Sequence, residues 1–298
     1  MKPSPPIRAA SLATLVAIWG TTWAVIRIGL GGIPPFTGVA LRFGIAGLVL
    51  WVAAFAAGLR GPRLRAPWWL WAAQGLFTFG ISYGLVYWGE QWVPTGLTAV
   101  LFATFPLWVA VLAHLLLPGE RMRPVGVLGL LIALGGVALL FSQDLHVLGG
   151  PRVAVASGVL LLAPLSSAIA QIVVKRWGSA VHPVTLNAGS MVVASATMGV
   201  LAFALERYRS VRFDATSVGS LLYLALLGTC VTFSLYFWLL RHMTATGLSL
   251  TAYAIPVVAV IVGAIVFGEA VTPQLLLGGL LVVAGTALAG LRRSAAEH

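Results

Sequence analysis

The sequence contains two stretches with one shared pattern, GERMRPVGVLGLLIALGG at residues 119–136 and GEAVTPQLLLGGLLVVAG at residues 268–285. In each stretch a proline lies four residues after the glutamate, and glycines lie nine and sixteen residues after it. Both stretches adjoin apolar runs that are long enough to cross a membrane. An internal duplication in such a chain is typical of transporters, in which the substrate site lies between the two halves.

The correspondence extends upstream of both stretches. Its paired elements are GLT at 96–98 with GLS at 247–249, Phe102 with Tyr253, and Pro106 with Pro256. The repeat is imperfect, because fourteen residues separate Pro106 from Glu120 and thirteen separate Pro256 from Glu269. We therefore expect two repeats, residues 1–145 and residues 146–298.

The composition indicates an integral membrane protein. Of the 298 residues, 60% are hydrophobic and 8% are charged, and the mean hydropathy is +1.01. A soluble domain has about 25% charged residues. The net charge of +11 does not point to nucleic acid, because the basic residues stand singly or in small groups between apolar runs, as topology signals beside anionic lipids do. The one cysteine, Cys230, lies in an apolar run, so we expect no disulfide framework, no Cys-based metal site and no cofactor.

Ten segments reach the roughly 20 residues that a spanning helix needs. They are residues 9–28, 36–58, 67–89, 94–117, 125–141, 153–174, 183–205, 217–240, 247–267 and 273–291. Open sheet edges are not tolerated in lipid, and barrel strands are only about ten residues long. The predicted fold class is therefore an all-α integral membrane protein with ten transmembrane helices. The first segment is longer than the core of a signal peptide, and we expect it to be retained.

The basic residues predict the orientation. If the N-terminus lies in the cytoplasm, twelve Lys and Arg residues lie in cytoplasmic loops and tails and five lie in outer loops. Positive charge concentrates on the cytoplasmic side, so both termini are predicted to be cytoplasmic. Three arginines between the seventh and eighth segments run against this rule. Because five is an odd number, the second five-helix repeat is inverted, which is an arrangement that gives alternating access.

Three sequence features together resemble the EamA-type drug/metabolite transporters. They are WGTTW at 19–23, LRF at 41–43 and the paired Pro…Gly-Glu…Pro…Gly…Gly blocks. The resemblance covers essentially the whole chain, and within the family the chain resembles the bacterial YddG-type amino-acid exporters. It implies an inner-membrane exporter whose cavity is enclosed by the first four helices of each repeat, with the fifth and tenth helices packed outside. The glycines of those two helices suit close packing on their own account; they are Gly126, Gly129, Gly135, Gly136, Gly278, Gly279 and Gly285.

Polar side chains inside apolar segments are costly and usually face a cavity or a partner. The third segment carries Gln74, Thr78 and Ser82 on one helical face, with Tyr83 and Tyr87 beside them, the sixth carries Ser167 and Gln171, and the seventh carries Asn187 and Ser190. Amides, hydroxyls and phenols suit a small polar metabolite with an apolar side chain. From this set we expect the substrate to be bound by Gln74, Thr78, Tyr83, Gln171 and Asn187. Hydrogen bonding between helices is the alternative for each.

The repeat-related positions supply further candidates. Thr98 and Phe102 correspond to Ser249 and Tyr253, and we expect all four side chains to meet across the axis between the repeats. Among the eleven tryptophans we expect Trp19 to face the cavity and most others to lie at the membrane interface. The following prolines, Pro106 and Pro256, each free a backbone carbonyl, so we interpret them as hinges rather than packing residues.

Arg42 and the acids bear on coupling. Arg42 lies well inside a predicted span, and because the Leu-Arg-Phe element recurs across the family irrespective of substrate, we interpret it as structural rather than substrate-binding. All seven acids lie at segment ends, in loops or in tails. A proton-coupled carrier usually has an acid at mid-depth, so we expect a uniporter or exchanger without tight proton coupling. We interpret Glu120 and Glu269 as structural residues that favour the N-terminal ends of the helices that follow them, and His114 as structural.

Other classes of protein fit less well. An enzyme would need a convergent catalytic set, and the sequence has no His-Glu zinc motif, no intramembrane Asp pair and no Gly-x-Ser-x-Gly. A channel remains a distant alternative, and a sensor or scaffold would normally carry an extramembrane domain. A phosphosugar or nucleotide-sugar carrier would need cavity cations, so neutral or zwitterionic solutes are favoured, amino acids first and other metabolites or drugs second. The expected partners are a small-molecule substrate and the lipid bilayer. The oligomeric state stays open.

Overall fold

The computed structural model describes residues 5–58, 67–117, 124–141, 150–178, 181–240 and 245–289. All regular secondary structure within these ranges is helical. The first half contains α1 (Pro5–Gly29), α2 (Pro35–Ala56), α3 (Trp68–Gln74), η2 (Gly75–Ser82), α4 (Tyr83–Gly89), α5 (Thr95–Phe102), α6 (Phe105–Leu116) and α7 (Pro124–Phe141). The second half contains α9 (Pro151–Leu160), α10 (Leu162–Trp177), α11 (Pro183–Glu206), α12 (Ala215–Leu222), η3 (Tyr223–Val231), α13 (Thr232–Leu240), α14 (Ala245–Phe267) and α15 (Pro273–Ala289).

Prolines define where many of these helices begin. The helices α1, α2, α7, α9, α11 and α15 all start at a proline. Proline suits the first turn because its fixed φ is helical and its missing N–H is not needed there. The predicted helix starts near these residues are therefore reproduced to within a few positions.

Six helical runs in the described ranges are long and apolar enough to cross a membrane. They are Pro6–Gly29, Pro35–Ala56, Thr95–Leu116, Pro151–Trp177, Pro183–Glu206 and Ala215–Tyr236. Three shorter apolar helices, Pro124–Leu140, Ala254–Phe267 and Pro273–Ala289, accompany them. In addition, α3, η2 and α4 follow one another without a break from Trp68 to Gly89.

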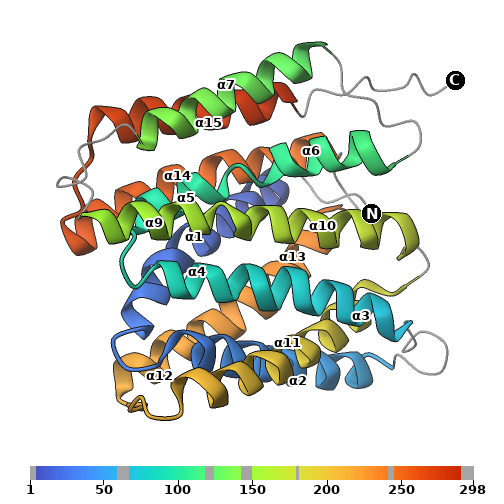
Figure 1. Cartoon of the computed structure of the whole chain (residues 1–298). Helices are drawn as coiled ribbons and strands as arrows, with labels where there is room; N and C mark the ends of the chain where they lie inside the picture. Colours follow the sequence, from blue (N-terminus) through green and yellow to red (C-terminus); the bar gives the residue numbers. More distant parts are fainter. Residues whose placement is uncertain are drawn as a thin grey trace, which may run out of the picture.

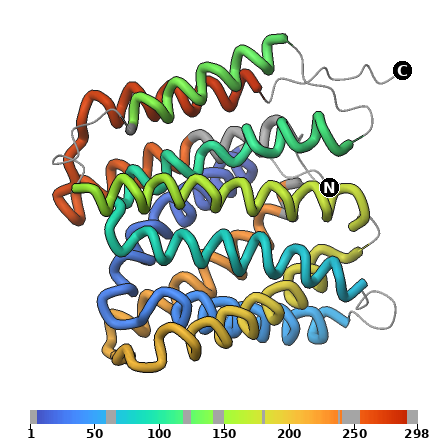
Figure 2. The backbone as a smooth tube through the Cα atoms, viewed as in Figure 1, coloured from blue at the N-terminus to red at the C-terminus, as the bar shows by residue number. Residues whose placement is uncertain are grey.

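The helices form a bundle in which most close pairs come from different halves (Figure 1). The helix α1 packs along α14, α2 along α11, and α7 along α15, while α10 packs on α6 and η2. The tube in Figure 2 shows α7 and α15 lying side by side along one edge of the bundle. Glycines explain how closely this pair approaches: a Cβ at Gly136 would lie 2.7 Å from the carbonyl oxygen of Gly278, and one at Gly285 would lie 2.6 Å from that of Gly129. Close packing is confirmed for these four glycines and is wrong for Gly135, which faces open space.

Among the described residues, each half contains one π-helical segment, and the two occupy related places. The π-helix η2 ends at the first residue of the sequence SYGLVYW at 82–88, and η3 ends just before the similar TFSLYFW at 232–238. Single π-helical turns inside α-helices are rare and occur frequently at functional sites. The matched positions of these segments make the two helical runs that contain them good places to look for a site.

The two repeat-related prolines lie in different surroundings. The residues Ala103 and Thr104 interrupt the helical run between α5 and α6, so Pro106 lies in the first turn of α6. Pro256, in contrast, lies inside the continuous helix α14. Pro106 contributes to this break, because it has no N–H to donate to the preceding helical turn and its ring clashes with the carbonyl there. A hinge role for either proline stays a prediction.

Candidate functional site

Arg42 is almost fully buried and joins the two halves of the chain. Its side chain leaves α2 about two turns from the start of that helix and is 1% exposed. Its Nε donates to Thr229 Oγ1 at 3.1 Å, and its Nη2 donates to the Gly228 carbonyl at 3.2 Å. Its Nη1 donates to the hydroxyl of Tyr87 at 3.4 Å. Because all three nitrogens have protein acceptors, the geometry supports the interpretation of Arg42 as a structural residue, which stays a prediction.

The guanidinium of Arg42 also lies against aromatic rings. Its Cζ is 4.8 Å from the ring centre of Tyr83 and 5.4 Å from that of Phe43. A cation over an aromatic face is attracted by the ring quadrupole, and the attraction grows when the pair is removed from water. These rings therefore help to accommodate a charge that has no carboxylate hydrogen-bond partner among the described residues.

An aromatic cluster extends from this point across the boundary between the halves. Trp19 of α1 lies 6.0 Å from Phe233 and 5.8 Å from Tyr236, measured between ring centres. Phe79 of η2 lies 5.8 Å from the same Phe233 and 4.9 Å from Phe43. We call this group the aromatic cluster; its members are Trp19, Phe43, Phe79, Tyr83, Phe233 and Tyr236. Four of them, Trp19, Tyr83, Phe233 and Tyr236, are only half-buried, so the cluster keeps part of its surface accessible.

Two predicted site residues from different halves meet directly. The Nε2 of Gln74, at the end of α3, donates to Oδ1 of Asn187 in α11 at 2.8 Å. Asn187 is 2% exposed, while Oε1 of Gln74 and Oγ of the neighbouring Ser190 are buried without a hydrogen-bond partner in the described part of the chain. The pair therefore fits hydrogen bonding between helices, which is the alternative to substrate binding. It also leaves two buried polar atoms without a hydrogen-bond partner among the described residues.

Other predicted site residues lie apart from this group. Thr98 is buried and donates to the carbonyl of Pro94 in its own helix. Phe102 packs on Trp23, with ring centres 5.3 Å apart. Thr78 is half-buried, and Gln171 is exposed on α10. The structure does not bring these four side chains into one cluster, so their roles stay predictions.

Two candidates belong to the part of α14 whose side chains are not described. Ser249 and Tyr253 lie in that helix, but their side chains are outside the described part of the chain. The expected meeting of these residues with Thr98 and Phe102 therefore stays a prediction.

One end of the bundle is tied together by carboxylates of the second half. This end is formed by the turns at residues 30–34, 90–94, 207–214 and 268–272, which lie on the left in Figure 1, and we call it the capped end. Glu206, which is 4% exposed, accepts from the backbone N–H groups of Phe36 and Thr37 at 3.0 and 2.8 Å, and from the Thr37 hydroxyl at 2.8 Å. It thereby satisfies amides at the start of α2 that have no partner within that helix.

Glu269 makes the equivalent contact with α5. It accepts from the backbone N–H groups of Thr95 and Gly96 at 2.7 and 3.0 Å, and from Arg27 Nη1 at 2.7 Å. The structural interpretation of Glu269 is thus supported, but the helix concerned differs from the one expected. Glu269 caps a helix of the other half rather than α15, which follows it in sequence. Glu120, its counterpart in the repeat, lies outside the described residues.

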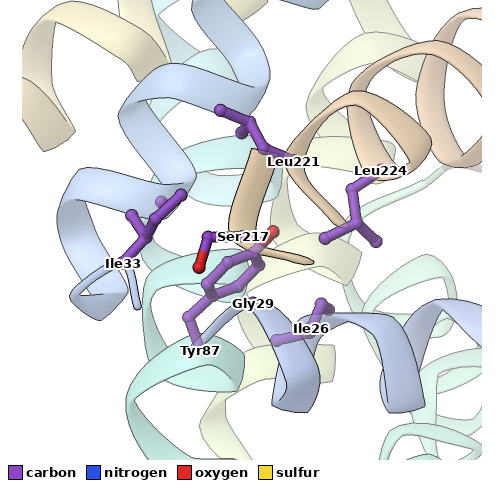
Figure 3. Close-up of a pocket in the computed structure, with 8 residues that line it drawn as sticks. Ile26, Gly29, Ile33, Tyr87, Ser217, Leu221 and Leu224 are labelled. Atoms are coloured by element: carbon purple, nitrogen blue, oxygen red, sulfur yellow. The ribbon is translucent and has the colours of Figure 1, made fainter. Parts of the chain in front are cut away.

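A small hollow opens near the capped end between the halves (Figure 3). Its lining residues are Ile26, Gly29, Ile33, Gly38, Tyr87, Ser217, Leu221 and Leu224. It has room for about one water molecule, so it is too small for an amino acid. Tyr87 connects it to Arg42, because the hydroxyl at the far end of its ring accepts from that residue.

The described residues contain no group of three or more His, Cys, Asp or Glu side chains that could hold a metal ion. Sequence reasoning missed the partners that matter most at the capped end. It placed all the acids, Glu206 and Glu90 among them, at segment ends, in loops or in tails. No sequence pattern predicts these contacts, since each depends on which turn of the other half lies opposite.

Comparison with known proteins gives one family. The model of the EamA-like transporter family matches the chain twice, over residues 7–142 and over residues 156–291. The Uncharacterized transporter YoaV of Bacillus subtilis is 29% identical over 92% of this chain and 93% of its own length. The Uncharacterized inner membrane transporter YedA of Escherichia coli K12 is 32% identical over 87% of this chain and 82% of its own.

One relative has a substrate in its name. The Probable terminal-alkyne amino-acid exporter of Streptantibioticus cattleyicolor is 28% identical over 95% of this chain and 93% of its own. A solved crystal structure also aligns, with a TM-score of 0.67 at 23% identity over 96% of this chain and 97% of that one. That likeness concerns the fold alone.

Proposed function

We propose a substrate and a mechanism for this chain on one premise: it belongs to the EamA-like transporter family. It is accordingly a membrane transporter, with apolar helices of membrane-spanning length. Within that class we propose that it exports amino acids with aromatic or other apolar side chains, by alternating access. The observation that carries the proposal is the aromatic cluster, because its half-buried rings come from both halves.

Ten spans in two inverted repeats are part of the proposal. The six long runs, the unbroken run from Trp68 to Gly89 and the three shorter apolar helices together supply ten. The boundary at residues 145 and 146 lies between the two matches of the family model. The packing supports a two-fold relation: α1 on α14 corresponds to α10 on α6 when the halves are exchanged, and α2 on α11 corresponds to itself.

The orientation proposed from the basic residues also predicts on which side of the membrane the capped end lies. With both termini in the cytoplasm of a cell (inner) membrane, the turns of the capped end face outward. Glu206 and Glu269 then close the outer end by linking the second half to α2 and α5. Opening toward the outside requires those links to break, as alternating access demands of one end at a time.

The chemistry of the buried groups favours neutral or zwitterionic solutes. Aromatic rings offer a surface for an apolar side chain, and amides such as Gln74 and Asn187 offer polar contacts. A phosphorylated substrate would need free cations, whereas Arg42 donates to three protein acceptors. The relative named as an exporter of a terminal-alkyne amino acid supports the same class.

For energy coupling we propose a uniporter or an exchanger, since the sequence places no acid at mid-depth. Glu90 is buried, but it lies in the turn between α4 and α5 at the capped end.

The test is uptake of a labelled amino-acid panel into proteoliposomes that contain the purified protein. Trp19→Ala removes a ring that bridges the halves, so we expect at least a tenfold loss of uptake of aromatic and aliphatic amino acids, equivalent to about 1.4 kcal/mol of binding. Trp68→Ala is the matched control, because Trp68 is 76% exposed at the start of α3. Gln171→Ala and Tyr253→Ala should also abolish transport without affecting insertion.

The outcome that contradicts the proposal is equally clear. Absence of uptake for every amino acid by a correctly inserted protein would remove the substrate class and leave the family unaffected. Equal uptake by Trp19→Ala and Trp68→Ala would remove the aromatic cluster from the site.

A further inference from the structure

Glu90 is the least satisfied buried acid in the described part of the chain. It lies in the turn between α4 and α5 and is 1% exposed. Neither of its carboxyl oxygens has a hydrogen-bond partner among the described residues. An ionised carboxylate that is removed from water without hydrogen-bond donors is strongly destabilised, and it binds a proton instead.

The two other glutamates at the capped end differ from Glu90 in that their carboxylates have hydrogen-bond donors. Glu206 and Glu269 each accept three hydrogen bonds, two of them from backbone amides at a helix start. Glu269 takes the N–H groups of Thr95 and Gly96, which begin the helix that follows Glu90 in the chain. The amides nearest in sequence to Glu90 are thus already used by a residue of the other half.

Three charged groups act on Glu90 from the elements around it. Arg27 at the end of α1 and Arg42 in α2 favour its ionised form, and Glu269 disfavours it. Tyr87, three residues earlier on α4, carries the hydroxyl that accepts from Arg42. The helix α9 packs on α4 and α5, but its one charged side chain, Arg152, is exposed. Arg27 is committed to Glu269 at 2.7 Å and makes no ion pair with Glu90.

We propose that Glu90 is a proton-binding site: its carboxyl group is protonated while the capped end is closed, and it releases the proton when that end opens. The released proton passes to water as the O–H bond breaks, and the electron pair stays on the carboxylate. Closing the end reverses the step, so Glu90 takes a proton from the water that leaves. The proposal rests on the proposed transport function and adds a pH-dependent step to it, because each cycle of this end then binds and releases one proton on the same side of the membrane.

The position of Glu90 explains why protonation and opening are linked. The contacts that close the capped end, from Glu269 to α5 and to Arg27, join the two halves beside the turn that contains Glu90. Separating the halves there admits water to the turn and frees the Arg27 guanidinium. Both changes favour the ionised form. In agreement, burial raises the pKa of Glu90 well above the usual range, Arg27 opposes this, Glu269 adds to it, and Arg42 opposes it.

The proton can be observed without any substrate. In infrared difference spectra of the purified wild-type protein between alkaline and acidic buffer, we expect the carbonyl band of a protonated carboxylic acid in apolar surroundings. Glu90→Gln should lose this band. Glu206→Gln is the matched control, because it removes an equally buried carboxylate that has three donors, and it should keep the band. A band that persists in Glu90→Gln, or its absence from the wild type, would overturn the proposal and make Glu90 an ionised counter-ion of Arg27 and Arg42.

The link to opening needs a second measurement. Cysteines at Gln91 and Val271, in a Cys230→Ser background, place spin labels on the two halves at the capped end. In the labelled protein that retains Glu90, we expect alkaline buffer to populate a longer distance between the two labels. In the labelled Glu90→Gln protein, we expect the distribution of distances to be the same in acidic and alkaline buffer. An equal shift in both proteins would overturn the link. Both measurements are independent of amino-acid uptake, so failure of the proposed substrate is distinguishable from failure of this inference.

Discussion

Arg42 and Glu90 are both almost fully buried, yet their charges are balanced in different ways. Arg42 is 1% exposed and donates to two side chains and one carbonyl, whereas Glu90 is equally buried and accepts from none of the described residues. A buried polar group with partners stabilises a specific arrangement, and one without partners is a source of instability or of function. The two residues therefore call for different experiments.

Removing the Arg42 side chain should affect stability more than substrate affinity. Arg42→Ala leaves the Tyr87 and Thr229 hydroxyls and the Gly228 carbonyl without their donor, and we expect a loss of roughly 2–5 kcal/mol in the free energy of unfolding. Arg42→Lys keeps the charge but lacks the planar guanidinium, so its free energy of unfolding should lie between those of the wild type and Arg42→Ala. Thermal unfolding in detergent measures the effect. A stable Arg42→Ala protein with lost selectivity for carboxylates would instead make Arg42 a substrate ligand.

Glu90 should make stability depend on pH, with a sign that follows from its burial. Its folded-state pKa is raised above the unfolded value, so the stabilisation is fully present below the unfolded pKa and is lost as pH rises through the folded pKa. The side chain of Glu90→Gln stays neutral at every pH, so the variant does not lose this stabilisation as the pH rises. We expect the variant and the wild type to melt alike in acid and the variant to melt higher in alkaline buffer. Parallel melting curves at all pH values would contradict this.

At the scale of helices, the glycines of α7 and α15 show how far a repeat pattern predicts packing. The spacing of Gly129 from Gly136, and of Gly278 from Gly285, is seven residues, which returns to nearly the same face of a helix. The repeat therefore indicates one glycine face on each helix. Gly135 lies next to that face but not on it. The sequence alone does not show that Gly136 contacts α15 and Gly135 does not.

A matched pair of substitutions tests this packing. Gly136→Ala places a methyl group 2.7 Å from a backbone oxygen of α15, and we expect a cost of about 1–3 kcal/mol from the forced separation. Gly135→Ala meets no atom and should gain up to about 1 kcal/mol from helix propensity. Unfolding of both variants in detergent gives the comparison. Equal effects would mean that the two helices are not held by this contact.

At the scale of the molecule, most of the architecture was predictable and most contacts between the halves were not. Apolar length, prolines at helix starts and the repeated blocks gave the helices, because each is a local property of the chain. The helix is broken before Pro106 but runs through Pro256 in α14, so the matching motif does not by itself predict whether a helix is continuous. The helix-start amides nearest to Glu90 are bound by Glu269, which is far away in sequence. The aromatic cluster needed Phe79 and Phe233, which sequence reasoning left among ordinary apolar residues.

The orientation of the whole molecule is open to a direct test. If both termini are cytoplasmic, a cysteine at Val271 in a Cys230→Ser protein reacts with an impermeant maleimide on intact cells. A cysteine at Trp177, which is exposed near the opposite end, reacts only after the cells are opened. The reverse labelling pattern would invert the topology and place the capped end in the cytoplasm.

The way in which Glu206 and Glu269 hold the capped end has a consequence for how such a chain can evolve. Four of the six hydrogen bonds that they accept come from main-chain amides. Every residue except proline supplies such an amide. After a gene duplication, most side chains at the starts of α2 and α5 can therefore change without loosening the joint between the copies. Besides the two acids, only Thr37 and Arg27 contribute a side chain to these six hydrogen bonds, which leaves the other residues around the joint free to diversify.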